Sequence, residues 1–262
     1  MTSEALLELQ ALATRLRRDC PWDREQTAKT IVPHTVEEAY EVADAALAGD
    51  DAKLIDELGD LLFQVVFLTL LLEERGAGDL EQVARGIHAK LVRRHPHIFG
   101  DAEADTAGRV RANWEQIKVD QEGREGIFHD VPETLPALLL ARKAQRRAAS
   151  VGFEYPDVAG AFDDLKEELA ELEREIESGV PAPEVEPDER QASELGDVLF
   201  AAVNVSRRIN ADPELELRRA TERFVQRVEQ AEQLALADGQ AFAELALADQ
   251  DRYFDKAKET LR

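Results

Sequence analysis

The sequence has 262 residues, which is enough for one large domain or two ordinary ones with a buried core. It is rich in alanine, leucine, glutamate and arginine and has only 14 glycines and 10 prolines, a composition typical of helical proteins. The formal net charge of −23 argues against a nucleic-acid polymer or an anionic membrane as the main partner.

Helices are predicted throughout the first half of the chain. Apolar spacing indicates an amphipathic helix over residues 3–18, which Pro21 ends, and a loop that continues to His34. Next comes a helix with a run of glutamates, then a second helix over residues 51–74. The hinge between them is short enough to make them antiparallel neighbours. Further helices are expected over residues 79–94 and 110–120.

The longest apolar run, residues 61–72, is interrupted by Gln64 and Thr69 and is too short to span a bilayer. We expect it to form a buried core helix. Cys20 is the single cysteine, so no intrachain disulfide can form, and the N-terminus lacks the pattern of a secretion signal. We therefore expect a cytoplasmic protein.

Acidic side chains of the two neighbouring helices are spaced to share one face. Glu38 and Glu41 are three residues apart, as are Glu57 and Asp60. Four carboxylates that converge in this way repel one another unless a hard divalent cation neutralises them. Oxygen ligands favour Mg²⁺, for which Mn²⁺ can substitute. A lone E-E-x-x-E run is more often a solvated helix face, but Asp60 enters an apolar helix, where an unpaired carboxylate is costly.

The same pattern begins again after residue 130, which indicates an internal repeat. A helix is predicted over residues 135–149 and is followed by a G-F-E-Y-P-D loop. Four acidic residues then recur as two pairs, with the spacing of the first copy inside each pair and a proline-rich linker between the pairs. They are Glu168, Glu171, Glu194 and Asp197.

We therefore predict an all-α protein built of two tandem homologous helical modules, residues 1–128 and 129–262. The division falls between Gly123 and Pro136, and residues 230–250 are expected to be an insertion in the second copy.

Basic residues also recur at matching offsets, with an aromatic residue beside a lysine in each copy. In an acidic protein, repeated cation pairs are better explained as phosphate clamps than as helix-dipole charges. The predicted substrate-binding residues of the first module are Lys53, Lys90, Arg93, Arg94, Trp114 and Lys118. Those of the second module are Arg190, Arg223, Arg227, Phe254 and Lys258.

These motifs resemble those of the MazG family. The resemblance rests on C-P-W-D-x-x-Q-T, then E-E-x-x-E followed by E-x-x-D, then K-L-V-R-R-H-P-H-I-F-G-D, and it extends over nearly the whole chain. It implies the all-α NTP pyrophosphatase fold, Mg²⁺-dependent hydrolysis of a nucleoside triphosphate to the monophosphate and pyrophosphate, and a homodimer or higher homo-oligomer. The metal ligands that it implies are Glu38, Glu41, Glu57 and Asp60, and Glu168, Glu171, Glu194 and Asp197.

A catalytic hypothesis follows from the charges. Anionic oxygens shield the α-phosphorus of a nucleoside triphosphate, so water attacks only when that charge is neutralised. Glu38 and Glu168 would take part in catalysis as metal ligands. Glu37 or Glu167, the glutamates of the E-E-x-x-E runs that are not ligands, could accept the proton of water. Binding mainly through phosphates predicts loose base selectivity.

Two alternatives compete with this hypothesis. A di-metal carboxylate bundle would need Glu-x-x-His pairs, and the carboxylate helices contain none. A non-enzymatic regulatory scaffold would retain the fold without the chemistry, and the intact carboxylates of both modules argue against it.

Overall fold

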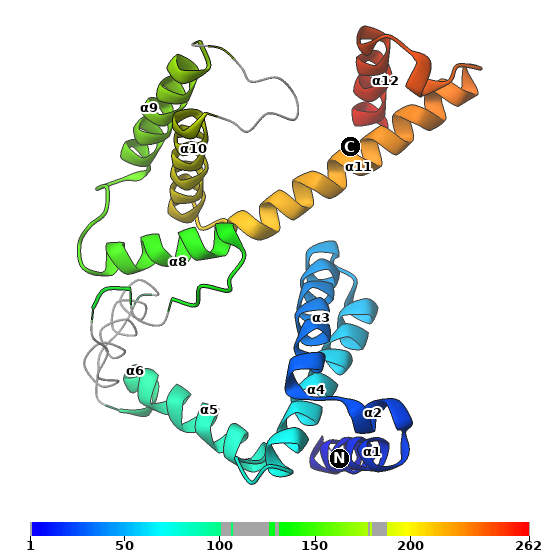
Figure 1. Ribbon diagram of the computed structural model, residues 1–262, viewed down its shortest axis with the longest axis vertical. Helices are drawn as coiled ribbons and strands as arrows, with labels where there is room; N and C mark the ends of the chain where they lie inside the picture. Colours follow the sequence, from blue (N-terminus) through cyan, green and yellow to red (C-terminus); the bar gives the residue numbers. More distant parts are fainter. Residues whose placement is uncertain are drawn as a thin grey trace. The chain divides into compact units, whose positions relative to one another are not determined.

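The computed structural model describes residues 2–100, 106, 126–128, 131–177, 179 and 188–261, and the regular elements among them are all helices (Figure 1). The predicted all-α class is confirmed. The helix expected over residues 110–120, together with Trp114 and Lys118, lies outside the described residues, as does most of the proline-rich linker. Within the described part, every helix is too short or too polar to cross a bilayer.

The chain divides into two compact units, Met1–Glu122 and Gly123–Arg262, called here the first and second units. The homology of the two modules stays a prediction.

The first unit is built around an antiparallel helix pair. Its described helices are α1 (Thr2–Asp19), α2 (Pro21–Glu25), α3 (Ala28–Ala48), α4 (Asp51–Glu73), α5 (Leu80–Arg94) and α6 (Pro96–Phe99). Helices α3 and α4 form the pair, α1 packs on α4, and α5 leaves the end of α4 (Figure 1).

The turn between α3 and α4 consists of a residue that ends one helix and a residue that caps the start of the next. Gly49 ends α3 in the left-handed conformation, with φ +70°, which glycine adopts without steric cost. Asp50 begins α4, and its carboxylate accepts a hydrogen bond from the backbone N–H of Lys53 at 3.0 Å. The hinge predicted between antiparallel helices is confirmed.

The loop predicted from Pro21 to His34 is wrong, because both prolines of this stretch lie within helices. Pro21 occupies the first turn of α2, where a helix needs no N–H from it. Thr27 caps α3 through a reciprocal capping box with Thr30, and Pro33 lies inside α3. Two residues before Pro33, Ile31 packs against helix α4.

That packing is the core of the first unit. Ile31 of α3 is buried against Phe67 and Leu71 of α4. The core-helix prediction for residues 61–72 is therefore confirmed for one face of α4. It is wrong for the opposite face, where Leu62 and Val65 remain 39% and 38% exposed.

The second unit repeats the arrangement of an antiparallel pair. Its described helices are α8 (Ala137–Ser150), α9 (Val158–Glu177), α10 (Glu189–Arg208), α11 (Pro213–Ala237), the 3₁₀ turn η1 (Phe242–Glu244) and α12 (Leu247–Thr260). Helices α9 and α10 form the pair, and α8 packs on α10 and α11 (Figure 1). Gln145 of α8 donates a hydrogen bond to the carbonyl of Phe200 at 2.7 Å.

Helix α12 folds back against α11 through small side chains. Ala231 and Ala235 of α11 are fully buried against Tyr253 and Ala257 of α12, so the two backbones can approach closely. The Tyr253 hydroxyl donates a hydrogen bond to Asp238 at 2.9 Å and also lies 2.9 Å from the side-chain oxygen of Gln240, so the polar end of this buried ring is satisfied.

Candidate metal centre

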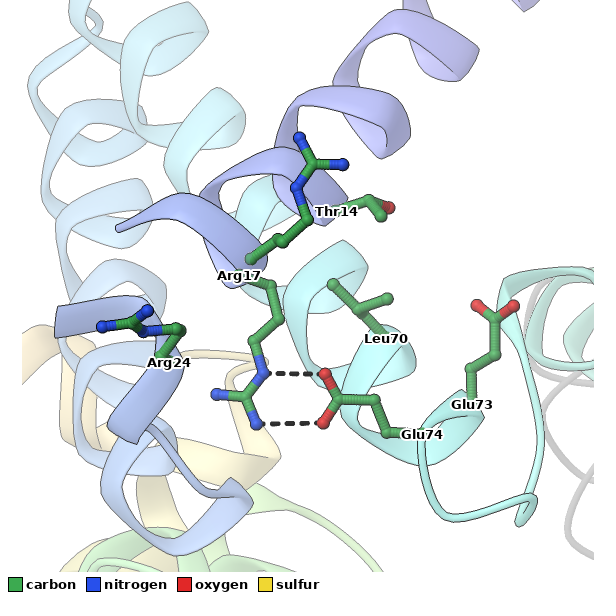
Figure 2. Close-up of a pocket in the computed structure, with 7 residues that line it drawn as sticks. Thr14, Arg17, Arg24, Leu70, Glu73 and Glu74 are labelled. Atoms are coloured by element: carbon green, nitrogen blue, oxygen red, sulfur yellow. Dashed lines mark hydrogen bonds and ion pairs between the residues drawn. The ribbon is translucent and has the colours of Figure 1, made fainter. Parts of the chain in front are cut away.

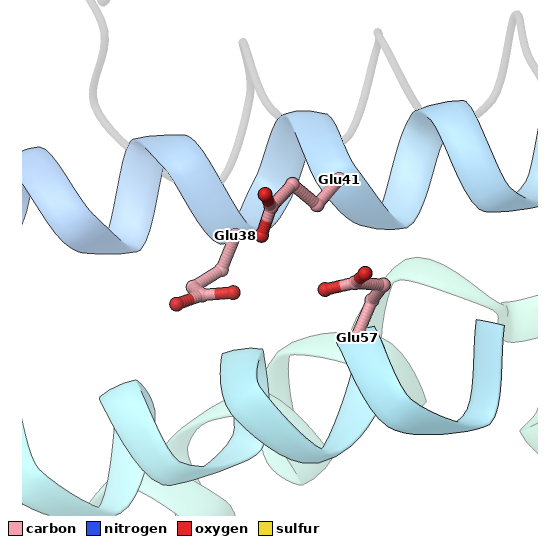
Figure 3. Close-up of side chains that lie close together, drawn as sticks. All are labelled: Glu38, Glu41 and Glu57. Carbon is pink, nitrogen blue, oxygen red and sulfur yellow. The ribbon is translucent and has the colours of Figure 1, made fainter. Parts of the chain in front are cut away.

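Three carboxylates meet between α3 and α4. One oxygen from each of Glu38, Glu41 and Glu57 lies within 4.8 Å of the other two, and Figure 3 shows these side chains pointing into the space between the helices. The three residues are called the first triad. They meet because Glu38 and Glu41 share a face of α3, and the short hinge sets Glu57 on α4 opposite them.

The first triad is electrostatically strained. Burial raises the pKa of Glu38 above its ordinary value, and the nearby charges of Asp60 and Glu41 raise it further. Burial also raises the pKa of Glu57, followed by the charge of Glu41, whereas the Lys53 ammonium opposes the shift. The Nζ atom of Lys53 lies 3.9 Å from a Glu57 oxygen. A bound cation would relieve the repulsion that these shifts reflect.

The second unit contains the same arrangement. One oxygen from each of Glu168 and Glu171 on α9 and Glu194 on α10 lies within 4.8 Å of the other two, and these residues form the second triad. Burial raises the pKa of Glu168, with further contributions from Asp197 and Glu171. Two independent helix pairs therefore concentrate carboxylates at matching positions.

Asp60 and Asp197 lie beside the triads rather than within them. Both are exposed, yet after burial their charges are the largest contributors to the raised pKa values of Glu38 and Glu168. Their role as fourth ligands stays a prediction. So does the catalytic role of Glu37 and Glu167, which are both exposed; Glu37 pairs with His34, whose Nδ1 lies 3.6 Å from a Glu37 oxygen.

The predicted phosphate clamps fall in different places. Lys53 adjoins the first triad, and Arg190 lies in the first turn of α10, four residues before Glu194. Lys90, Arg93 and Arg94 lie on α5, which leaves the far end of α4 (Figure 1).

In the second unit, Arg223 and Arg227 lie in the middle of α11 on either side of Phe224. The Phe224 ring packs against that of Phe254 with centroids 5.8 Å apart, and Lys258 Nζ lies 4.9 Å from the Phe254 centroid. The structure thus brings Phe224 of α11 together with Phe254 and Lys258 of α12, while α11 runs away from the pair that carries the second triad (Figure 1). Substrate binding by this group stays a prediction.

A separate pocket of the first unit contains side chains that hold neighbouring helices together. It is lined by Thr14, Arg17, Arg18, Arg24, Leu70, Glu73 and Glu74. Figure 2 shows the Arg17 guanidinium crossing it to Glu74, with two hydrogen bonds of 2.7 and 2.9 Å. Arg17 also donates to the carbonyls of Asp23 and Gln26 at 2.5 and 3.0 Å. Glu74 follows Glu57 by 17 positions, about 25 Å along a helix. This pocket therefore anchors the α1–α3 connection at a distance from the carboxylates.

Two residues beside the triads escaped the sequence reasoning. His34 and Asp164 each lie four residues before the first glutamate of a triad, Glu38 and Glu168, and each contacts an aromatic residue from the preceding connection. The spacing alone could have revealed them, because residues four apart share a helix face. Their aromatic partners could not be found in this way, since those contacts depend on tertiary structure.

The triads fit a hard divalent cation. All their ligand atoms are carboxylate oxygens, and they converge from two helices without protonatable nitrogen or sulfur ligands in either set. Glu57 is only 8% exposed, and a buried carboxylate requires a compensating positive charge. The neighbouring Lys53 supplies part of it at 3.9 Å, and a cation would supply the remainder.

Comparison with known proteins places this arrangement in a family. Residues 26–99 match the model of the MazG nucleotide pyrophosphohydrolase domain. The chain is 38% identical over 255 residues to the nucleoside triphosphate pyrophosphohydrolase/pyrophosphatase MazG of Thermotoga maritima, covering 96% of this chain and 94% of that protein. It is 38% identical over 256 residues to the nucleoside triphosphate pyrophosphohydrolase of Escherichia coli K12, covering 95% of each.

The chain is also 37% identical over 245 residues to the uncharacterized protein YabN of Bacillus subtilis, where the match covers 93% of this chain and 49% of that protein. The two enzymes named above are matched over nearly their full lengths, so the likeness includes both units. The expected family is confirmed: this chain belongs to the MazG family.

Proposed function

We propose that the protein is a nucleoside triphosphate pyrophosphohydrolase that requires Mg²⁺. Water would add to the α-phosphorus, the bond from that phosphorus to the α–β bridging oxygen would break, and the products would be a nucleoside monophosphate and pyrophosphate. The observation that carries the proposal is the pair of carboxylate triads, found in a chain that matches enzymes of this name over almost its whole length.

The carboxylates would hold the cation between the helices of each pair. The ligands are the triads together with Asp60 in the first unit and Asp197 in the second. When bound, Mg²⁺ would neutralise phosphate oxygens and stabilise charge that develops in the transition state. Glu37 and Glu167, which lie next to Glu38 and Glu168 in the sequence, are suited to accept the proton of water because they are exposed and stand outside the triads.

The basic residues would hold the phosphates that leave as pyrophosphate. In the first unit these are Lys53, Lys90, Arg93, Arg94 and Lys118, with Trp114 near the base. In the second unit they are Arg190, Arg223, Arg227 and Lys258, with Phe254 near the base. Recognition through phosphates rather than base edges gives loose base selectivity.

We also propose that the protein is a homodimer or higher homo-oligomer. Leu58, Leu62 and Val65 form an exposed apolar stripe along α4, at spacings of three and four residues. Leu195 and Leu199 are exposed at matching positions on α10. Burial of such stripes between subunits would remove apolar surface from water. Light scattering coupled to size exclusion should give at least twice the chain mass of 29.2 kDa, and a monomer would contradict the proposal.

The activity is tested by supplying each nucleoside triphosphate with Mg²⁺ and measuring pyrophosphate and orthophosphate separately. We expect pyrophosphate and the nucleoside monophosphate from several bases at comparable rates. Orthophosphate and the diphosphate as sole products would refute the proposed reaction. A strong preference for one base would refute the proposed selectivity alone.

Site assignment is tested by the double variant Asp60→Ala/Asp197→Ala, which should lose turnover while it keeps its helical circular dichroism. The matched control is Asp56→Ala/Asp163→Ala, which removes two other exposed acidic residues from the same helix pairs. Unchanged turnover in the first variant would remove Asp60 and Asp197 from the site. A fully folded protein without any turnover in its native form would favour the regulatory scaffold.

A further inference from the structure

The loop before α9, residues 152–157, is anchored on both sides of one tyrosine. Glu154 forms ion pairs with Arg207 and Arg208 at the end of α10. An Nη atom of Arg208 also donates a hydrogen bond to the carbonyl of Pro156 at 3.2 Å. These contacts fix the residues that flank Tyr155 and leave its ring little freedom to move away from α9.

The Tyr155 side chain lies along the face of α9 that leads to the second triad. A Cβ atom at Gly160 would come within 3.1 Å of Tyr155 side-chain atoms, so ring and helix are in close contact. One turn further on, the Tyr155 hydroxyl donates a hydrogen bond of 2.7 Å to an Asp164 carboxylate oxygen. Gly160, Asp164 and Glu168 follow one another at intervals of four residues and so share this face.

Asp164 is therefore an extra carboxylate one helical turn from the second triad. Its charge adds to those that raise the pKa of Glu168. It is nevertheless not one of the three residues whose oxygens converge there. A free aspartate at this position could turn along the helix face toward a cation, because short side chains four residues apart are neighbours.

The first unit has no carboxylate at the matching position. His34 stands four residues before Glu38, as Asp164 does before Glu168. The Trp22 ring approaches the His34 ring edge-on with centroids 6.1 Å apart. Each unit thus places an aromatic residue against this position, but the second unit alone has an acid there to restrain.

Building on the proposed function, we propose that Tyr155 is a positioning residue that holds Asp164 away from the metal site of the second unit. Its hydroxyl satisfies the Asp164 carboxylate, and its anchored ring keeps that hydroxyl in place. The metal then retains open positions for the phosphates of a nucleoside triphosphate, and the Asp164 charge stays one helical turn from the position where they bind.

The test measures Mn²⁺ binding by calorimetry, without nucleotide, in the full chain carrying Glu38→Gln and Glu57→Gln to disable the first triad. In this parent, Tyr155→Phe keeps the ring on Gly160 but releases Asp164. We expect Mn²⁺ to bind about five-fold more tightly, the effect of one further charge near a surface cation. The KM for a nucleoside triphosphate with Mg²⁺ should rise by a similar factor, because the added charge repels substrate.

Adding Asp164→Asn to Tyr155→Phe should abolish both the gain in Mn²⁺ affinity and the rise in KM. The matched control is Tyr253→Phe, which also removes a tyrosine hydroxyl from a carboxylate, Asp238, but outside the second triad. This control should leave Mn²⁺ affinity unchanged. A structural role of Tyr155 would not be reversed by Asp164→Asn.

Unchanged Mn²⁺ affinity in Tyr155→Phe would overturn this inference while leaving the proposed function intact. So would an altered affinity that persists after Asp164→Asn is added. A folded parent that binds no Mn²⁺ at all would overturn the proposed metal site, and the inference with it.

Discussion

The ion pairs of Glu154 with Arg207 and Arg208 make a stability prediction that can be worked out from the structure. Glu154→Gln removes the charge but keeps the size of the side chain. The three side chains are only 23%, 13% and 21% exposed, and the Nε atoms of both arginines are buried without a partner among the described residues. Loss of the carboxylate charge would leave two largely buried guanidinium groups poorly compensated.

The expected loss lies between that of a surface pair and that of a fully buried pair. We expect the free energy of unfolding to fall by about 2 kcal/mol at pH 7. The Arg207 hydrogen bond is the main reason that the pKa of Glu154 is lowered from its ordinary 4.5 in the folded state. A lowered pKa stabilises the folded state above the unfolded value, and this contribution is lost as the pH falls through the folded value. At pH 4 the difference between the native chain and the variant should therefore shrink, by up to about 0.8 kcal/mol.

Urea unfolding followed by far-ultraviolet circular dichroism, at pH 7 and at pH 4, measures both quantities. The matched control is Asp163→Asn, which breaks an ion pair with Lys166 whose side chains are 73% and 70% exposed. This control should change stability by less than about 0.5 kcal/mol. A Glu154→Gln loss no larger than that of the control, or a loss that grows toward acid pH, would refute the reasoning.

Three further predictions concern helix ends and the metal. Gly49→Ala should destabilise the first unit by about 1 kcal/mol, because φ is +70° at this position, although a Cβ atom there would meet open space. Gly86→Ala, inside α5 and equally unobstructed, should instead stabilise the unit by about 0.8 kcal/mol, and equal thermal midpoints of the two variants would contradict this prediction. Thr27→Ala should reduce the free energy of unfolding by about 1 kcal/mol, since it removes the α3 capping box. The control Thr14→Ala breaks a hydrogen bond inside α1, and a smaller loss of stability in Thr27→Ala than in this control would refute the role of the cap. Adding Mn²⁺ at a hundredfold excess over its dissociation constant should stabilise the native chain by about 2.7 kcal/mol per site, measured in a thermal shift assay. The double variant Glu57→Gln/Glu194→Gln should abolish this gain, and an equal thermal shift in that variant would place the metal elsewhere.

The features that followed from the sequence were those set by local spacing. The helix class, the antiparallel α3–α4 pair and the convergence of Glu38, Glu41 and Glu57 all follow from helical periodicity and a short hinge. The second triad followed in the same way from its repeated spacing. Periodicity of this kind is independent of tertiary contacts, so a single sequence suffices to find it.

The features that escaped prediction depend on partners distant in the chain. Pro33 lies inside α3, and Ile31 two residues earlier is packed against α4, a contact that the local pattern does not reveal. The anchoring of the Tyr155 loop depends on Arg207, more than fifty residues away. Which face of α4 is buried likewise depends on packing against other helices. Leu62 and Val65 are predicted as core residues from their residue type alone, but both are exposed.

The division into two units has a practical consequence for spectroscopy. Both tryptophans of the chain, Trp22 and Trp114, belong to the first unit, whereas the second unit contains two of the three tyrosines. Indole fluorescence therefore reports on the first unit alone, while circular dichroism sums over both. Coincident transitions in the two signals would show that the units unfold as one cooperative body, and separated transitions would give the strength of each half without cutting the chain.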